Sequence, residues 1–406
     1  MLTLLALLSV ASAHPLDGLP GLYPELSGLY RDLHANPELS NQEVETSAKL
    51  AARMQALGFE VTEKVGGNGV VAVLHNGSGP TVWLRTDMDA LPLEEKTGLA
   101  YASTTSVMHA CGHDVHMTSW IGAATLLSRD RKAWKGTLVM IAQPAEELGS
   151  GAKAMIADGL FTRFPKPDVA FAIHDSGAYP AGSVGLVPGY AMANVDSVDI
   201  TVFGRGGHGA APHRTVDPVV LAARTVLSLQ TLVSRETDPL KPAVVTVGSI
   251  HGGTKHNIIS DEVKLQLTVR SYDDQVRADL LAGIARIAKA EALAANAPKE
   301  PEIRVDPGPS ATYNEPSLAV ALRPRLEKIL GREQVLDGTP IMGAEDFSEF
   351  HRAGIPAFLI WVGAAPKGAV DFPSTHSSLF APEEEPTLKT GTTALVTAAL
   401  MGFGAK

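Results

Sequence analysis

Short, strongly apolar runs alternate with segments of helical periodicity along most of the chain. Runs of this kind predict strands buried on both faces, because a strand with one exposed face alternates apolar and polar residues. Strands that alternate with helices favour a mainly parallel sheet covered by helices on both sides. We therefore predict an α/β fold, with one covering helix over 114–128 that Asp114 caps. The four apolar runs are TVWL (81–84), TLVMIA (137–142), DVAFAI (168–173) and AFLIWV (357–362).

Residues 191–309 follow a different pattern, with half-buried strands and two helices in the order β-α-β-β-α-β. This order forms a compact α+β unit by itself. We predict that it is a small second domain inserted into the first, which then consists of 14–190 and 310–406. The expected strands are 197–204, 243–250, 262–271 and 302–305, and the expected helices follow Pro218 and span 275–295.

Polar residues follow three of the apolar runs directly. The first run leads into Arg85, Asp87 and Asp89, the second into QPAEE (143–147), and the third into His174 with Asp175. Ligands of open α/β sheets bind beyond the carboxyl ends of the strands. These side chains are therefore expected to converge on one site.

The stretch MHACGHDVH (108–116) contains the only cysteine of the chain. A thiolate is a strong metal ligand, and imidazole and carboxylate complete the usual set. Cys111 and His113 can share one loop, with Gly112 allowing a tight bend. By itself this pattern also fits a buried cysteine beside a hydrogen-bonded histidine.

The adjacent acids Glu146 and Glu147 strengthen the metal interpretation. Two neighbouring carboxylates repel each other unless a cation or a proton separates them. One can bind a metal while the other holds a water as a general base. The alternative is a solvated helix start, where acids favour the helix dipole. His174 and His376 complete a set of five candidate ligands.

The charge and the N-terminus bear on partners and location. The net charge of −10 without a basic block argues against a nucleic-acid partner. Residues 1–13 form an apolar run that ends in Ala-Ser-Ala, which predicts a signal peptide and a periplasmic or secreted protein. The alternative is a hydrophobic N-terminal stub on a cytoplasmic protein. No other run is long enough to predict a membrane span.

Six motifs together resemble one known family, the metal-dependent amidohydrolases that include hippurate hydrolase, bacterial N-acyl-amino-acid amidohydrolases and plant auxin-conjugate hydrolases. The resemblance implies a dinuclear metallohydrolase domain interrupted by a lid or dimerisation domain. It also implies a homodimer or larger homo-oligomer. The motifs are RTDMDALPLEEKTG, MHACGHDVH, QPAEELGSGAKAMI, GRGGHGAAPH, GAEDFS and THSSLF.

The resemblance also implies roles for individual residues. Cys111 would bridge two divalent metal ions, with His113 and His174 on one ion and Glu147 and His376 on the other. The family usually has a proline two residues after the last of these histidines, where this chain has a serine.

Four further residues take implied roles from the same resemblance. Glu146 would be the general base, and His208 on the lid would help to stabilise the oxyanion. Asn257 and Arg270 would contact the carboxylate of the substrate.

The predicted reaction is hydrolysis of an N-acyl or N-aroyl amino acid to a carboxylic acid and a free amino acid. The alternatives are a dipeptidase or carboxypeptidase with the same chemistry, and a metal-binding or scaffolding protein that has lost catalysis, against which Glu146 and His208 argue. The ligand types accept zinc or manganese, and also cobalt or nickel. The sequence does not specify the acyl group or the amino acid.

Overall fold

The computed structural model describes residues 14–405, so the predicted signal peptide at 1–13 lies outside the described residues. The chain divides into two compact units. The first extends to Gly189 and also includes Asn314–Thr339 and the chain from Ala353 onward. The second comprises Tyr190–Tyr313 together with Pro340–Arg352. The catalytic and lid roles of the two units stay predictions.

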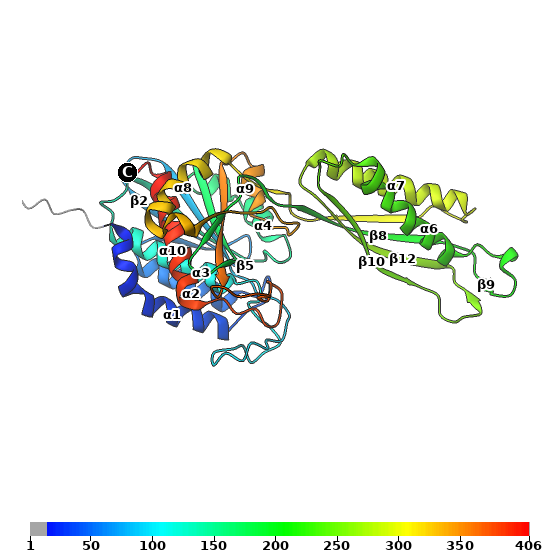
Figure 1. Ribbon diagram of the computed structural model, residues 1–406, viewed down its shortest axis with the longest axis horizontal. Helices are drawn as coiled ribbons and strands as arrows, with labels where there is room; N and C mark the ends of the chain where they lie inside the picture. Colours follow the sequence, from blue (N-terminus) through cyan, green and yellow to red (C-terminus); the bar gives the residue numbers. More distant parts are fainter. Residues whose placement is uncertain (1–13, 406) are drawn as a thin grey trace, which may run out of the picture. The chain divides into compact units, whose positions relative to one another are not determined.

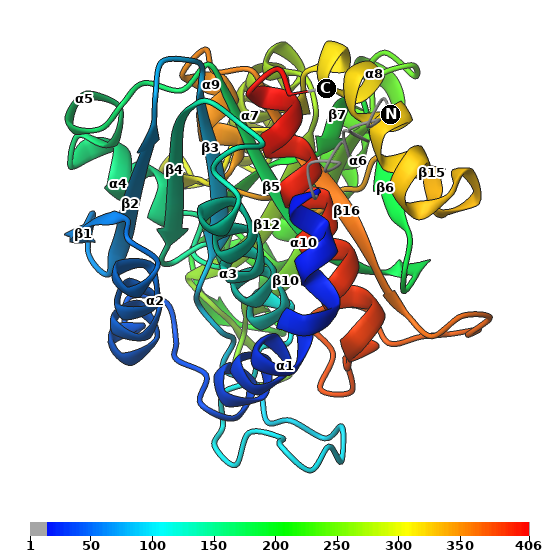
Figure 2. The same cartoon turned by 90° about the vertical axis from the view of Figure 1, so that its left-hand side faces the viewer.

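The first unit contains an eight-stranded sheet whose central pairings are parallel (Figure 2). β3 pairs in parallel with β4 and β5, and β5 pairs in parallel with β16. These are the four strands predicted from the apolar runs, so the predicted mainly parallel α/β sheet is confirmed. In spatial order the strands are β1 (Glu60–Val65), β2 (Gly69–Asn76), β4 (Gly136–Gln143), β3 (Thr81–Asp87), β5 (Val169–Pro180), β16 (Ala357–Ala365), β6 (Val184–Leu186) and β15 (Val335–Asp337).

Long helices cover one face of this sheet, and two short helices lie on the other. Phe171 and Ile360 point into the core under the long helices, with Leu26 and Leu395 among the helical residues packed there. On the opposite face the ring of Phe161 stacks on Trp83 at 5.5 Å. The long helices are α1 (Leu19–Ala35), α2 (Val44–Ala56), α3 (His113–Arg129), α8 (Pro316–Leu330) and α10 (Glu384–Gly402), and the short ones are α4 (Gly151–Ala157) and α5 (Leu160–Arg163).

Helix α3 begins differently from the prediction. Its N-cap is Gly112 in the left-handed conformation, with φ of 78°, and Asp114 already lies in the first turn. The Asp114 carboxylate instead bonds to the ring of His34 at 2.7 Å. The predicted N-cap was therefore wrong, because a glycine turn starts the helix without a side-chain cap. No helix in residues 14–405 combines the length and the apolar character needed to cross a membrane.

The second unit has a four-stranded antiparallel sheet with two helices on one face (Figure 1). Val198, Ile200 and Val202 alternate along one strand and pack under these helices, which is the half-buried pattern that the sequence predicted. The predicted βαββαβ order is confirmed. The strands in spatial order are β10 (Ala243–Gly252), β12 (Glu262–Ser271), β8 (Asn194–Phe203) and β13 (Glu302–Pro307), and the helices are α6 (Pro218–Thr231) and α7 (Asp274–Ala294).

Short elements complete the described chain. Two small sheets pair β9 with β11 and β7 with β14. Their bounds are β9 (Gly207–His208), β11 (Ile258–Ile259), β7 (Gly189–Met192) and β14 (Thr312–Asn314). The remaining helical turns are η1 (Pro15–Gly18), η2 (Pro212–Arg214), η3 (Leu232–Glu236), η4 (Arg332–Gln334) and α9 (Ser348–Arg352).

Candidate metal centre

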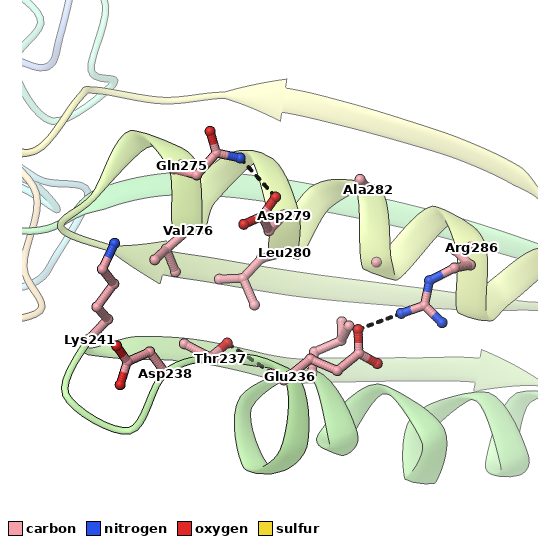
Figure 3. Close-up of a pocket in the computed structure, with 12 residues that line it drawn as sticks. Glu236, Thr237, Asp238, Lys241, Gln275, Val276, Asp279, Leu280, Ala282 and Arg286 are labelled. Atoms are coloured by element: carbon pink, nitrogen blue, oxygen red, sulfur yellow. Dashed lines mark hydrogen bonds and ion pairs between the residues drawn. The ribbon is translucent and has the colours of Figure 1, made fainter.

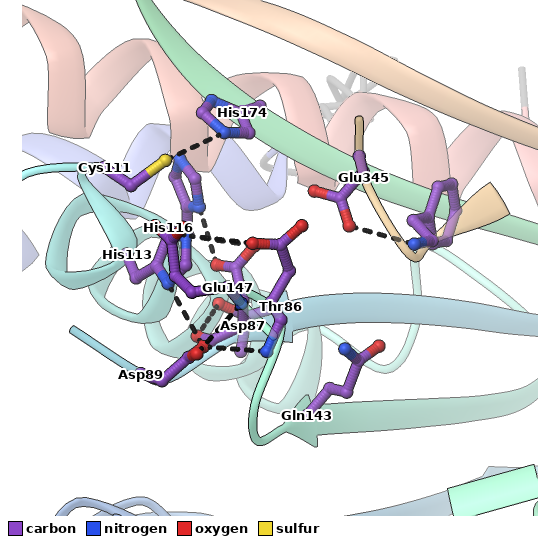
Figure 4. A network of polar contacts seen from close by, with 12 residues as sticks. Thr86, Asp87, Asp89, Cys111, His113, His116, Gln143, Glu147, His174 and Glu345 are labelled. Carbon is purple, nitrogen blue, oxygen red and sulfur yellow. Dashed lines mark hydrogen bonds and ion pairs between the residues drawn. The ribbon is translucent and has the colours of Figure 1, made fainter. Parts of the chain in front are cut away.

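The turn that starts α3 places Cys111 and His113 on neighbouring positions of one loop. Gly112 between them has a positive φ, and a Cβ there would lie 2.2 Å from Oδ2 of Asp175. Only glycine fits this position without displacing the carboxylate. The turn directs the thiol toward His174, with 3.5 Å between Sγ and the ring Nε2 (Figure 4).

His174 lies within a strand rather than beyond its end. The sequence predicted that the strand stops at residue 173, but β5 continues to Pro180 because its backbone remains paired with β16. The ring Nδ1 lies 2.7 Å from the carbonyl oxygen of Asp175. Since a carbonyl only accepts, Nδ1 carries the proton and Nε2 presents a lone pair toward Cys111. This is the tautomer that a metal-binding imidazole needs.

Glu146 and Glu147 are held in place by their own backbone after β4. Their N–H groups donate to the two carboxylate oxygens of Asp89, each at 3.0 Å. Both side chains are nearly buried, with 8% and 9% exposed respectively. The alternative of a solvated helix start is therefore wrong for this pair, which lies inside the site.

Glu147 lies between two of the predicted histidine ligands. Its Oε1 is 3.4 Å from Nε2 of His376 and 4.0 Å from Nε2 of His113. Burial alone would raise the pKa of Glu147, but the nearby ring of His376 and the charge of His113 lower it. Glu147 is therefore held as a carboxylate.

His376 reaches the site from a loop far along the chain. Its backbone N–H donates to the carbonyl of Ala110 at 2.8 Å, which ties the two loops together. The residue has a positive φ of 65°, an uncommon conformation for a non-glycine residue. Ser378, at the position where the family usually has proline, leaves the ring of His376 beside Glu147.

The ligand atoms fall into two groups that share one sulfur. Cys111, His113 and His174 form one group, and Cys111, Glu147 and His376 form the other, with all atoms of each group within 4.8 Å of one another. Within residues 14–405, neither ring nitrogen of His113 nor Oε1 of Glu147 makes a hydrogen bond, although all are buried. Buried polar atoms without partners are costly, and cations would satisfy them. These residues could therefore hold two cations, one at each group.

Burial and neighbouring charges control the two residues of the turn. Burial raises the pKa of the Cys111 thiol well above its usual value, and the Glu147 carboxylate raises it further. Burial would lower the pKa of His113, but Asp87 and Asp89 together raise it well above its usual value. The thiol is consequently neutral until a cation displaces its proton.

A second layer of buried residues supports the candidate ligands; the sequence placed Arg85 and Asp87 at the site but assigned them no specific role. Asp87 bonds to Arg85 and to the ring of His116, each at 2.7 Å. Burial raises the pKa of Asp87, yet His113, His116 and Arg85 outweigh it and hold the pKa well below its usual value. His116 also accepts from the backbone N–H of Asp175 at 2.9 Å. Two sequence signals pointed to these residues. Asp87 lies at the end of a strand, and His116 follows His113 by three positions on the same helix.

The other three predicted site residues belong to the second unit. His208 is exposed in β9, opposite Ile258, and its Nδ1 accepts from the backbone of Ala210 at 3.0 Å. The carbonyl of Asn257 accepts from Gly209 at 2.9 Å, so Asn257 lies beside this histidine. Arg270 lies in β12.

The guanidinium of Arg270 is half-buried and bound within its own unit. Its Nη1 donates to the carbonyl of Met342 at 2.7 Å, and its Nε donates to Oγ1 of Thr268 at 3.3 Å. These bonds fix the guanidinium in one orientation. Its predicted contact with a substrate carboxylate stays a prediction.

Comparison with known proteins connects this arrangement to a family. The model of peptidase family M20/M25/M40 matches residues 83–401. Hippurate hydrolase of Campylobacter jejuni is 39% identical over 337 residues, which are 81% of this chain and 85% of that protein. Thermostable carboxypeptidase 2 of Saccharolobus solfataricus is 38% identical over 362 residues, 87% of this chain and 90% of that one.

A solved structure gives the same result. A Bacillus subtilis protein described as a dinuclear metal-binding peptidase of the M20 family has a TM-score of 0.79 to this chain at 29% identity. The match covers 95% of this chain and 100% of that chain.

Proposed function

The chain belongs to peptidase family M20/M25/M40, and from this premise we propose that it cleaves the amide bond of N-acyl or N-aroyl amino acids. The products are a carboxylic acid and a free amino acid. Membership makes the chain an enzyme of the metal-dependent amidohydrolase and metallopeptidase class. The observation that carries the proposal is the pair of ligand groups that share Cys111, with Glu146 beside them.

Two divalent cations would be held by the candidate ligands, His113 and His174 on one and Glu147 and His376 on the other, with Cys111 between them. When bound, such a pair polarises an amide carbonyl and lowers the pKa of water. The ligand set favours zinc or manganese, with cobalt and nickel as alternatives.

Glu146 is the proposed general base. Its Oε2 lies 3.9 Å from Nε2 of His113, so its carboxylate faces the ligand cluster. It takes a proton from the attacking water and delivers it to the leaving amine nitrogen. His208 donates to the oxyanion that develops on the carbonyl oxygen. Asn257 and Arg270 hold the carboxylate of the substrate.

Replacement of Glu146 tests the assignment of the base. Glu146→Gln is expected to lower kcat about 100- to 10,000-fold, because general-base catalysis contributes that range. Bound metal is expected to remain, since Glu146 is not a proposed ligand. Glu63→Gln, an exposed glutamate on β1, serves as the control. Unchanged kcat in Glu146→Gln would remove Glu146 from the mechanism.

A dipeptidase or carboxypeptidase activity is the second candidate, favoured by the likeness to thermostable carboxypeptidase 2. Hippurate, N-acetyl amino acids and dipeptides, assayed in parallel, separate the two. We expect kcat/KM to be higher for hippurate or N-acetyl amino acids than for dipeptides. Equal or better turnover of dipeptides would make peptidase activity the function.

Assembly and location are part of the same proposal. We propose a homodimer or larger homo-oligomer, which sedimentation of the purified protein measures. The apolar run at 1–13 with its Ala-Ser-Ala end supports export. N-terminal sequencing of the mature protein tests this, with a start at His14 as the expected result.

A further inference from the structure

The second unit contains two hollows of similar size but different chemistry. The first, of about 540 Å³, lies between η3 and α7. Its charged groups have partners: Glu236 pairs with Arg286 at 2.6 Å (Figure 3), Lys241 pairs with Asp273 at 2.9 Å, and Asp279 accepts from the amide of Gln275 at 2.9 Å. This hollow therefore presents no group that calls for a ligand.

The second hollow, of about 520 Å³, has an aromatic wall. The ring of Tyr190 stacks on Tyr272 at 5.8 Å and meets the edge of Tyr313 at 5.1 Å. The ring of His351 lies 4.8 Å from Tyr313. Rings arranged in this way bind a flat apolar group, and the volume falls in the range of small-molecule sites.

Helix α9 adds polar groups to the same hollow. Ser348, His351 and Arg352 are spaced i, i+3 and i+4, so they lie on one helical face, and all three line the hollow. Ser348 is only 1% exposed, and within residues 14–405 its hydroxyl makes no hydrogen bond. Nδ1 of His351 is also buried and makes no hydrogen bond within residues 14–405. Both residues line the hollow, and a polar ligand that reached these two atoms would satisfy them.

Opposite charges lie at the edge of this hollow. The guanidinium of Arg352 is 3.8 Å from the carboxylate of Asp274 and 2.9 Å from the hydroxyl of Ser310. The side chains of this ion pair are 57% and 73% exposed, so the pair contributes little to stability. One cation and one anion beside an aromatic wall match a ligand that carries both charges and an aromatic ring.

We propose that this cavity binds a free α-amino acid with an aromatic side chain. Arg352 receives the carboxylate, Asp274 receives the ammonium group, and the rings of Tyr190 and Tyr313 receive the side chain. Ser348 and His351 provide the remaining hydrogen bonds. Binding does not depend on the proposed reaction, although a ligand of this class would also be a product of it.

Equilibrium dialysis of the full chain with radiolabelled L-phenylalanine tests the proposal. We expect saturable binding that weakens at least tenfold in Arg352→Gln and in Asp274→Asn. Arg286→Gln, an arginine with a similarly exposed side chain in an ion pair of the other hollow, is the matched control and is expected to bind like the original protein. Unlabelled 3-phenylpropanoate and 2-phenylethylamine, each missing one charge, are expected to compete poorly.

Ser348→Ala provides a second variant, since removal of one buried hydroxyl leaves the charges in place. It is expected to weaken binding severalfold while circular dichroism and Tm stay unchanged. The proposal is overturned if the protein shows no saturable binding at millimolar phenylalanine. It is equally overturned if binding disappears with a metal chelator but is unaffected in Arg352→Gln and Asp274→Asn, because phenylalanine would then bind only at the metal centre.

Discussion

The candidate residues of the two units differ in how they are held. In the first unit the proposed ligands Cys111 and His113 are buried, and a second layer of buried hydrogen bonds surrounds them. In the second unit the ring of His208 is exposed, and its Nδ1 accepts from the backbone N–H of Ala210. Cys111 and His113 are thus enclosed by other buried side chains, whereas the ring of His208 faces solvent.

This difference separates two kinds of mutational effect. Changes among buried, networked residues act on metal affinity and folding together, because a removed partner leaves other buried groups unsatisfied. Changes at an exposed residue leave the fold intact and act on the rate alone. Paired measurements of bound metal, Tm and kcat therefore distinguish the two units.

Removal of the metals is expected to give the largest effect among the tests of the first unit. Prolonged dialysis against a chelator is expected to reduce activity at least about 1,000-fold, since several kcal/mol of transition-state stabilisation are lost. Return of zinc or manganese should restore activity, and the ion that restores most identifies the working metal. Full activity in protein shown by elemental analysis to be metal-free would contradict the dinuclear proposal.

His208→Ala tests the second unit. Loss of one oxyanion donor is expected to lower kcat about 100- to 1,000-fold. Bound metal and Tm should stay unchanged because the side chain is exposed. His213→Ala, an exposed histidine of the same segment, is the control with kcat near the original value. A drop in metal content in His208→Ala would contradict the separation of the two units.

The sequence predicted the main features of both units for physical reasons. The strands β3, β4 and β16 were found because doubly buried strands are almost uniformly apolar. The candidate ligands were selected because their residue types are rare together, and their role as ligands stays a prediction. The continuation of β5 past His174 was missed, because polar residues within a buried strand interrupt the apolar pattern.

The contacts within the supporting layer and the bounds of the two units could be identified only from the structure. Asp87 and Asp89 were expected at the site because they follow a buried strand, but their hydrogen-bond partners and the contact with His116 join residues that are distant in sequence. The segment Pro340–Arg352 groups with the second unit through nonlocal contacts that no local pattern reports. The same holds for the cavity around α9, whose aromatic residues come from three separate strands or strand ends.

Asp89→Asn tests whether the supporting layer acts through the metals. Asp89 lies 3.5 Å from Nδ1 of His113 and accepts the backbone N–H groups of Glu146 and Glu147. Loss of such an outer partner is expected to weaken metal affinity about 10- to 100-fold. Competition with a chromogenic chelator measures this. Asp158→Asn, an exposed aspartate of the same unit, is the control and should bind metal normally.

The pH dependence of metal binding gives the smallest expected effect and tests the bridging thiolate directly. Burial holds the pKa of the Cys111 thiol well above its usual value, so the thiol is protonated from pH 6 to 8 without metal. Binding of the first cation to the sulfur would displace this one proton, so the affinity for that cation rises with pH. One released proton corresponds to about a tenfold change in apparent Kd per pH unit.

Cys111→Ala isolates this proton from the others. Titration of His113 contributes to the slope in both proteins, because its pKa is also raised by Asp87 and Asp89. The apparent Kd of the original protein should therefore change more steeply with pH than that of Cys111→Ala. The difference in slope should be about one factor of ten in Kd per pH unit. Equal slopes would mean that the thiol keeps its proton and does not bridge the ions. Such a result would leave the first unit with two separate metal sites, and its buried sulfur would then be a packing residue beside His174.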